Sequence, residues 1–245
     1  MQEFVRRARV GLASGGPATR TATIVLTLLL TVVVDAAAHG VSAGDKGYIQ
    51  ETFGIRILPF MYLGAKHMIT GYDHLLFLLG VIFYLYRLRE IGVYVTLFAI
   101  GHSTTLIVGV LTGVSVSAYI IDAIIGFSVV YKALDNMGAF RQWFGVQPNT
   151  RVATMVFGLF HGFGLATKLL DFEMDKDGLI QNLVSFNIGV EIGQLLALSS
   201  ILIAMSYWRS RRGFSRHGYA AIVVIMSAGF VLVGYQLAGY FITQA

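Results

Sequence analysis

The chain contains no cysteine and few charged residues. Without cysteine it can form no disulfide, no thiolate metal site and no iron–sulfur cluster, and it offers no cysteine nucleophile. Any bound metal must therefore be held by nitrogen, oxygen or methionine sulfur. Charged residues make up 13% of the chain, roughly half the fraction of a soluble domain. With 56% apolar residues and a mean hydropathy of +0.71, the composition is that of a membrane protein.

Basic patches and catalytic motifs are also missing. The net charge of +5 comes from lysines and arginines that lie between hydrophobic runs, so nucleic acid is not predicted as a partner. There is no phosphate-binding loop and no nucleophile elbow. The hydroxyls of residues 103–105, next to His102, are better explained by bonds to helix carbonyls than by hydrolase chemistry. The chain is therefore not predicted to be an enzyme.

Residues 1–38 have the three parts of a secretory signal peptide. A basic stretch precedes an apolar run from Ala22 to Val34, and a small-residue segment follows, with an Ala-x-Ala site that ends at Ala38. Cleavage there would make His39 the first mature residue, where its α-amine and imidazole suit copper or nickel. The simpler alternative is that His39 marks only the cleavage point, and the alternative for the whole segment is an uncleaved anchor.

Residues 39–245 are predicted to form a single domain, an all-helical bundle of six transmembrane helices. Each hydrophobic run approaches the roughly 20 residues that cross the hydrocarbon core. A moderately apolar segment, 53–68, precedes the first run; since it contains Pro59, it either lies on the outer surface or enters the bilayer as a broken helix. The predicted spans are 69–86, 91–112, 115–133, 152–170, 180–207 and 219–242.

The loop charges predict the orientation of these spans. Lysine and arginine concentrate in the first, third and fifth loops, which places those loops in the cytoplasm. The second loop is uncharged and the fourth, from Asp171 to Asp177, is acidic. We therefore expect a multi-pass protein of the bacterial inner (cytoplasmic) membrane with both mature termini outside. Lipid is its immediate partner, and the sequence is compatible with a homo-oligomer or a membrane-protein partner.

Six ionisable residues lie inside segments that are otherwise apolar. Such groups at membrane depth cost several kcal/mol unless paired, so they mark a pathway or a ligand site. At about 1.5 Å per helical residue, the five that lie within the predicted spans fall in one layer between the outer interface and the midplane, about 5 to 17 Å deep, and His67 lies just before the first span. A shared depth predicts a shared metal site. The residues are His67, Asp73, His74, His102, His161 and Glu191.

The spacing of these residues leaves two roles open for the aspartate. His67 and His74 are seven residues apart and would share a helix face unless Gly71 breaks the helix. Asp73 could bind the ion directly or hold a neighbouring imidazole in the required tautomer.

Small residues accompany the ionisable ones. A GxxxG spacing lets helix backbones approach closely, so packing at these motifs would also assemble the site. The motifs are Gly158 and Gly162 around His161, and Gly189 and Gly193 around Glu191. Elsewhere, Asp122 and Lys132 are about 15 Å apart along the third span, too far to pair with each other. We expect them to pair with other helices or to line a path.

Four segments resemble, in the same order, motifs of the HupE/UreJ family of hydrogenase and urease accessory membrane proteins. The first segment, residues 67–77, has the family's order of histidine, glycine, aspartate and histidine. The likeness extends from about residue 60 to residue 205. Many members carry proline where this chain has Met68. The other three segments are 101–105, 158–164 and 186–194.

The resemblance implies a secondary permease for nickel, or in some relatives cobalt, in which the signature histidines and aspartate are essential. It assigns ligand roles to His67, Asp73, His74, His102, His161 and Glu191. Imidazole ligands also suit copper and zinc. One alternative is a non-transporting, metal-binding accessory subunit of a membrane complex. Another is a protein that binds haem between two histidines, which would leave both carboxylates unexplained.

Overall fold

The computed structural model describes residues 53–170, 177–211 and 213–244. These residues form α-helices and, within the described ranges, no strand, which confirms the all-helical class. The predicted signal segment 1–38, His39 and most of the acidic fourth loop lie outside the described residues. The helices are α4 (Ile57–Thr70), α5 (Tyr72–Ile82), α6 (Leu88–Thr112), α7 (Ala118–Asn136), α8 (Ala139–Phe144), α9 (Thr150–Leu170), α10 (Leu179–Arg209) and α11 (Phe214–Gln244).

Four of these helices, α6, α9, α10 and α11, are long and apolar enough to cross a membrane. They correspond to the second, fourth, fifth and sixth predicted spans. Helix α7 has 19 residues but carries Asp122, Lys132 and Asp135, and α5 has only 11 residues. The protein therefore has the helices of a membrane protein, while the count of six spans stays a prediction.

The first predicted span, 69–86, is wrong as a single helix. Helix α4 ends at Thr70 and α5 begins at Tyr72, because Gly71 adopts extended backbone angles (φ −74°, ψ 99°). Helix α5 is about 16 Å long, too short to cross about 30 Å of hydrocarbon. Helix α4 packs along α10. Pro59 lies in the first turn of α4 and does not break it, and the choice between the two alternatives for residues 53–68 stays a prediction.

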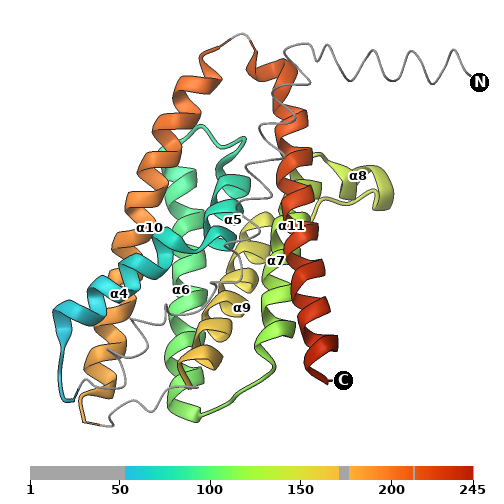
Figure 1. Ribbon diagram of the computed structural model, residues 1–245. Coiled ribbons are helices and arrows are strands. Elements are labelled where there is room, and N and C mark those ends of the chain that lie inside the picture. The colour runs from blue at the N-terminus through green and yellow to red at the C-terminus, as the bar shows by residue number, and fades with distance from the viewer. Residues whose placement is uncertain (1–52, 171–176, 212, 245) are drawn as a thin grey trace, which may run out of the picture. The chain divides into compact units, whose positions relative to one another are not determined.

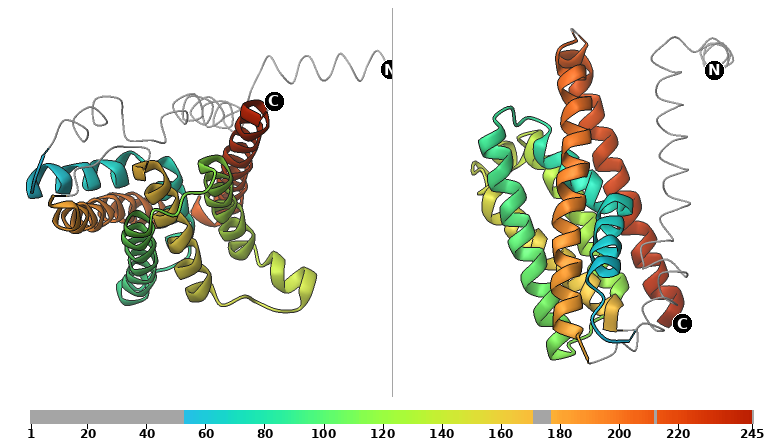
Figure 2. Two further views of the ribbon diagram at one scale, coloured as in Figure 1. Left: turned by 90° about the horizontal axis from the view of Figure 1, so that it is seen from below. Right: turned by 90° about the vertical axis from the view of Figure 1, so that its left-hand side faces the viewer.

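Three helix pairs make the closest packing: α6 with α9, α4 with α10, and α7 with α11 (Figures 1 and 2). Glycines permit the first two contacts. A β-carbon on Gly162 would collide with the carbonyl oxygen of His102, and one on Gly189 would collide with the carbonyl oxygen of Met61. Both predicted GxxxG motifs are therefore confirmed as packing motifs.

Two apolar clusters fill the interior, with a polar layer between them. Along α6, Phe98 belongs to one cluster and Leu106 to the other, with His102 between them. Along α10, Val190 and Ala197 belong to different clusters. The polar layer is thus enclosed by apolar side chains on both sides, where an unpaired charge would be costly.

Candidate metal centre

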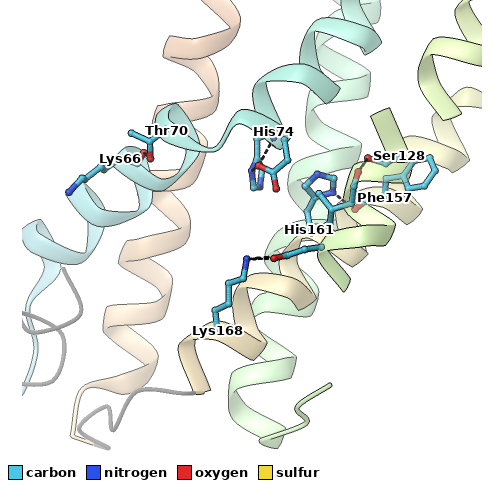
Figure 3. Close-up of polar contacts among 10 residues, drawn as sticks. Lys66, Thr70, His74, Ser128, Phe157, His161 and Lys168 are labelled. Atoms are coloured by element: carbon cyan, nitrogen blue, oxygen red, sulfur yellow. Dashed lines mark hydrogen bonds and ion pairs between the residues drawn. The ribbon is translucent and has the colours of Figure 1, made fainter. Parts of the chain in front are cut away.

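Asp73 and His74 form the first turn of α5, and the break at Gly71 sets their positions. Oδ1 of Asp73 accepts hydrogen bonds from the backbone N–H and from Nδ1 of His74, each at 2.8 Å (Figure 3). A β-carbon on Gly71 would lie 2.7 Å from Nδ1 of His74 and 3.2 Å from Oδ1 of Asp73. Glycine at this position therefore leaves room for the Asp73–His74 pair.

These hydrogen bonds select the tautomers of two histidines. An ionised carboxylate can only accept, so Nδ1 of His74 carries the proton and Nε2 keeps its lone pair. On α9, Nδ1 of His161 donates to the carbonyl oxygen of Phe157 at 2.8 Å (Figure 3). In both rings Nε2 is buried and has no hydrogen-bond partner among the described residues. Both imidazoles are thus set to bind a cation through Nε2.

His102 is the most deeply buried of the histidines. Its side chain is 0% exposed, and within the described part of the chain neither ring nitrogen has a hydrogen-bond partner. An unsatisfied buried polar group costs about 1 to 3 kcal/mol, so a ring kept in this state points to a ligand. The close approach of Gly162 to the His102 backbone holds α6 and α9 together at this level.

The histidine rings converge around His74. Its ring centroid lies 5.1 Å from that of His67, 5.9 Å from that of His102 and 4.8 Å from that of His161. One ligand nitrogen from each of His67, His74 and His102 lies within 4.8 Å of the others. Nitrogens that share a metal at about 2.1 Å are about 3.4 Å apart. A small inward movement would therefore close these three around one ion.

Glu191 lies on α10 outside this group. Its side chain is exposed, whereas Val190, Gly193 and Gln194 of the same helix are buried. The structure thus brings together the four predicted histidines, with Asp73 hydrogen-bonded behind His74, and places Glu191 on another face of α10. A ligand role for Glu191 stays a prediction from the sequence.

Helix α10 instead contributes Gln194, about one turn further along the helix than Glu191, to the buried interior. Gln194 is 2% exposed and lines a small cavity together with His74. Its Nε2 donates to the carbonyl oxygen of Val95 at 3.5 Å. Gln194 carries no ionisable group, so in the sequence only its place at the end of the fourth family-like segment distinguishes it.

Two buried ion pairs involve α7. Nζ of Lys168 donates to both carboxylate oxygens of Asp122, at 2.7 and 3.0 Å, and so links α9 to α7 (Figure 3). The expectation that Asp122 pairs with another helix is confirmed. Lys132 instead pairs within its own helix, with Asp135. The spacing of three residues between Lys132 and Asp135, about one helical turn, is the signal in the sequence for this pair.

A family model described as HupE / UreJ protein matches residues 43–244. The chain belongs to the HupE/UreJ family. No curated protein and no solved structure matches the chain. The family is linked to metal uptake or accessory functions, which agrees with the histidine group in this HupE/UreJ protein.

The geometry does not favour the haem alternative. The ring of Phe98 packs against His74, His102 and His161, with centroid distances of 6.1, 6.1 and 5.0 Å. Phe77 also packs against His161, at 5.6 Å. These aromatic rings occupy the space beside the histidines that a flat macrocycle would need.

Proposed function

We propose that this HupE/UreJ protein is a secondary permease for a divalent transition-metal ion, nickel first and cobalt second, and that the ion passes through the four histidines. One observation carries the proposal: three helices bring one ligand nitrogen each to within 4.8 Å of one another. The nitrogens lie in a layer enclosed by apolar side chains. Imidazole ligands favour nickel, cobalt, copper or zinc over calcium or magnesium.

Charge compensation gives Asp73 its role in this proposal. Neutral imidazoles bind a divalent ion without neutralising it, and an uncompensated charge in a low-dielectric layer is costly. Asp73 supplies one negative charge through its hydrogen bond to His74. The proposed site therefore consists of His67, His74, His102 and His161, with Asp73 behind them.

The membrane potential is sufficient to drive uptake. Inward movement of a divalent cation gains about 4.6 kcal/mol per 100 mV, so no ATP hydrolysis is required. Because metal-binding imidazoles must be neutral, protons compete with the metal for the site. Outward movement of protons can therefore be coupled to metal entry.

Equilibrium dialysis of purified protein against nickel, cobalt, copper or zinc tests the site. We expect one ion per chain in the parent protein and loss of that ion in His102→Asn. His217→Asn is the matched control, because His217 is exposed at the start of α11. Binding that is unaffected by His102→Asn, or reduced equally by both substitutions, would exclude the histidine group as the metal site.

A further inference from the structure

Three phenylalanines lie about one helical turn from the histidines, all on the same side. Helices α6 and α9 begin at the end of the bundle where α5 finishes (Figure 1). In each of three pairs, the phenylalanine therefore lies on that same side of its histidine. That direction leads to loops 83–87 and 137–149, which are predicted to be cytoplasmic. The pairs are His74 with Phe77 on α5, Phe98 with His102 on α6, and Phe157 with His161 on α9.

The three rings form one connected group, which we call the phenylalanine layer. The centroid of Phe77 lies 5.4 Å from that of Phe98 and 5.8 Å from that of Phe157. Phe77 and Phe98 are 3% and 4% exposed. The layer also touches the histidines, since Phe98 packs 5.0 Å from His161. No gap that would admit water is expected between rings in this contact.

A small cavity adjoins the layer. His74, Phe77 and Phe98 form one of its walls. Met68 on α4, next to His67, and Leu78 also line it. The other lining residues lie further toward the same loops: Val81, Tyr94, Val95, Thr154 and Gln194.

We propose that the phenylalanine layer is the inner gate of the metal pathway: it separates His102 and His161 from the cytoplasm, while His74 reaches the cavity beside it. This inference rests on the proposed function. A constriction formed by apolar rings excludes water, and a cation cannot cross it while it is dry. The histidines can then hold an ion without letting it leak inward.

Helix α5 is the element whose movement would open this gate. It carries both His74 and Phe77, it is only 11 residues long, and Gly71 separates it from α4. A displacement of α5 would withdraw one histidine ligand and one ring of the layer together. Release of the ion and opening of the gate would thus be one movement.

The absence of cysteine allows a direct test. Thr154→Cys places one thiol in the cavity, and Val146→Cys places one in the exposed loop between α8 and α9 as a reference for the face of the membrane. Each single-cysteine protein is treated with a membrane-impermeant maleimide, in spheroplasts and in inverted vesicles. We expect the thiol at position 154 to react only from the face where the thiol at position 146 reacts. Adding Phe98→Ala should raise its reaction from the opposite face several-fold.

Two further variants distinguish the loss of the gate from a loss of folding. Phe157→Ala changes the layer at a half-buried position, and it should also raise reaction from the opposite face. Phe83→Leu is the control, since Phe83 is 1% exposed but packs against Trp208 and Phe214 away from the histidines. It should leave the one-sided reaction unchanged.

Equal reaction from both faces in the parent background would overturn the gate. So would one-sided reaction that persists in folded Phe98→Ala and Phe157→Ala proteins. The maleimide experiment needs no metal, so it separates the two proposals. If the one-sided reaction is lost in the phenylalanine variants but the parent does not accumulate metal, the permease is refuted and the gate is retained. Metal accumulation by the parent together with equal reaction from both faces would support the permease and refute the gate.

Discussion

At the residue scale, the chemistry depends on which ring nitrogen of each histidine carries the proton. Asp73 accepts from Nδ1 of His74, and the Phe157 carbonyl accepts from Nδ1 of His161. In both cases Nε2 is left as the metal-binding atom. The Asp73 carboxylate also fixes the orientation of the His74 ring, as acceptors behind metal-binding histidines generally do.

Removing the charge of Asp73 should therefore weaken metal binding. We expect Asp73→Asn to lower the affinity about 10-fold to 100-fold, measured by equilibrium dialysis of purified protein. Glu90→Gln, in the first turn of α6, is the matched carboxylate-to-amide change outside the predicted site, and it should leave the affinity unchanged. A loss of affinity in Glu191→Gln as well would show that Glu191 belongs to the metal site.

Binding should also weaken as the pH falls. Only neutral imidazole binds a metal, so protons compete with the metal for the histidines. The affinity should therefore fall as the pH is lowered stepwise and recover when the pH is raised again. Nickel titrations at stepped pH values measure this. A constant affinity across the range would argue against ligation by histidine.

At the element scale, close helix contacts at glycines position the rings. Gly162 packs against the carbonyl oxygen of His102. A β-carbon on Gly158 would lie 2.5 Å from the carbonyl oxygen of Phe98. The α6–α9 contact thus sets the level of one histidine and one phenylalanine together. A change in this contact should affect both the metal site and the phenylalanine layer.

Gly162→Ala should force α6 and α9 apart. We expect a loss of about 1 to 3 kcal/mol of stability, as for other overpacked interiors, together with weaker metal binding. Gly234→Ala on α11 is the control, since nothing lies within 4 Å of its β-carbon position. Thermal unfolding in detergent and metal dialysis measure the two effects. Unchanged stability and unchanged metal binding in Gly162→Ala would contradict the role of this contact.

Much of this arrangement could be predicted from the sequence. Hydropathy located the four long apolar helices, and the shared depth of the histidines predicted their convergence. The helix break at Gly71 was recognised only as an alternative, because its backbone angles depend on the packing of α4 against α10. The Lys168–Asp122 pair and the phenylalanine layer depend on contacts between helices, which spacing within one helix does not reveal.

At the scale of the whole molecule, the number of spans depends on α7 and on the short helix α5. Helix α7 buries Asp122, Lys132 and Asp135, and both lysine–aspartate pairs reduce the cost of placing these charges in a bilayer. If α7 crosses the membrane, the loops at its two ends lie on opposite faces. We therefore expect single thiols in Val114→Cys and Val146→Cys, both at exposed positions, to react with an impermeant maleimide from opposite faces. Reaction from the same face would exclude the six-span topology.

The central claim is that the protein carries a metal ion across the membrane through the histidine site. Whole-cell metal content, measured by mass spectrometry with nickel, cobalt, copper, zinc and manganese supplied together, tests it most directly. The comparison is between the parent protein and Asp73→Asn at equal expression in the membrane. We predict selective accumulation of one metal, nickel first, that is lost in the variant. Equal metal content in both would contradict the permease and favour a non-transporting, metal-binding accessory subunit.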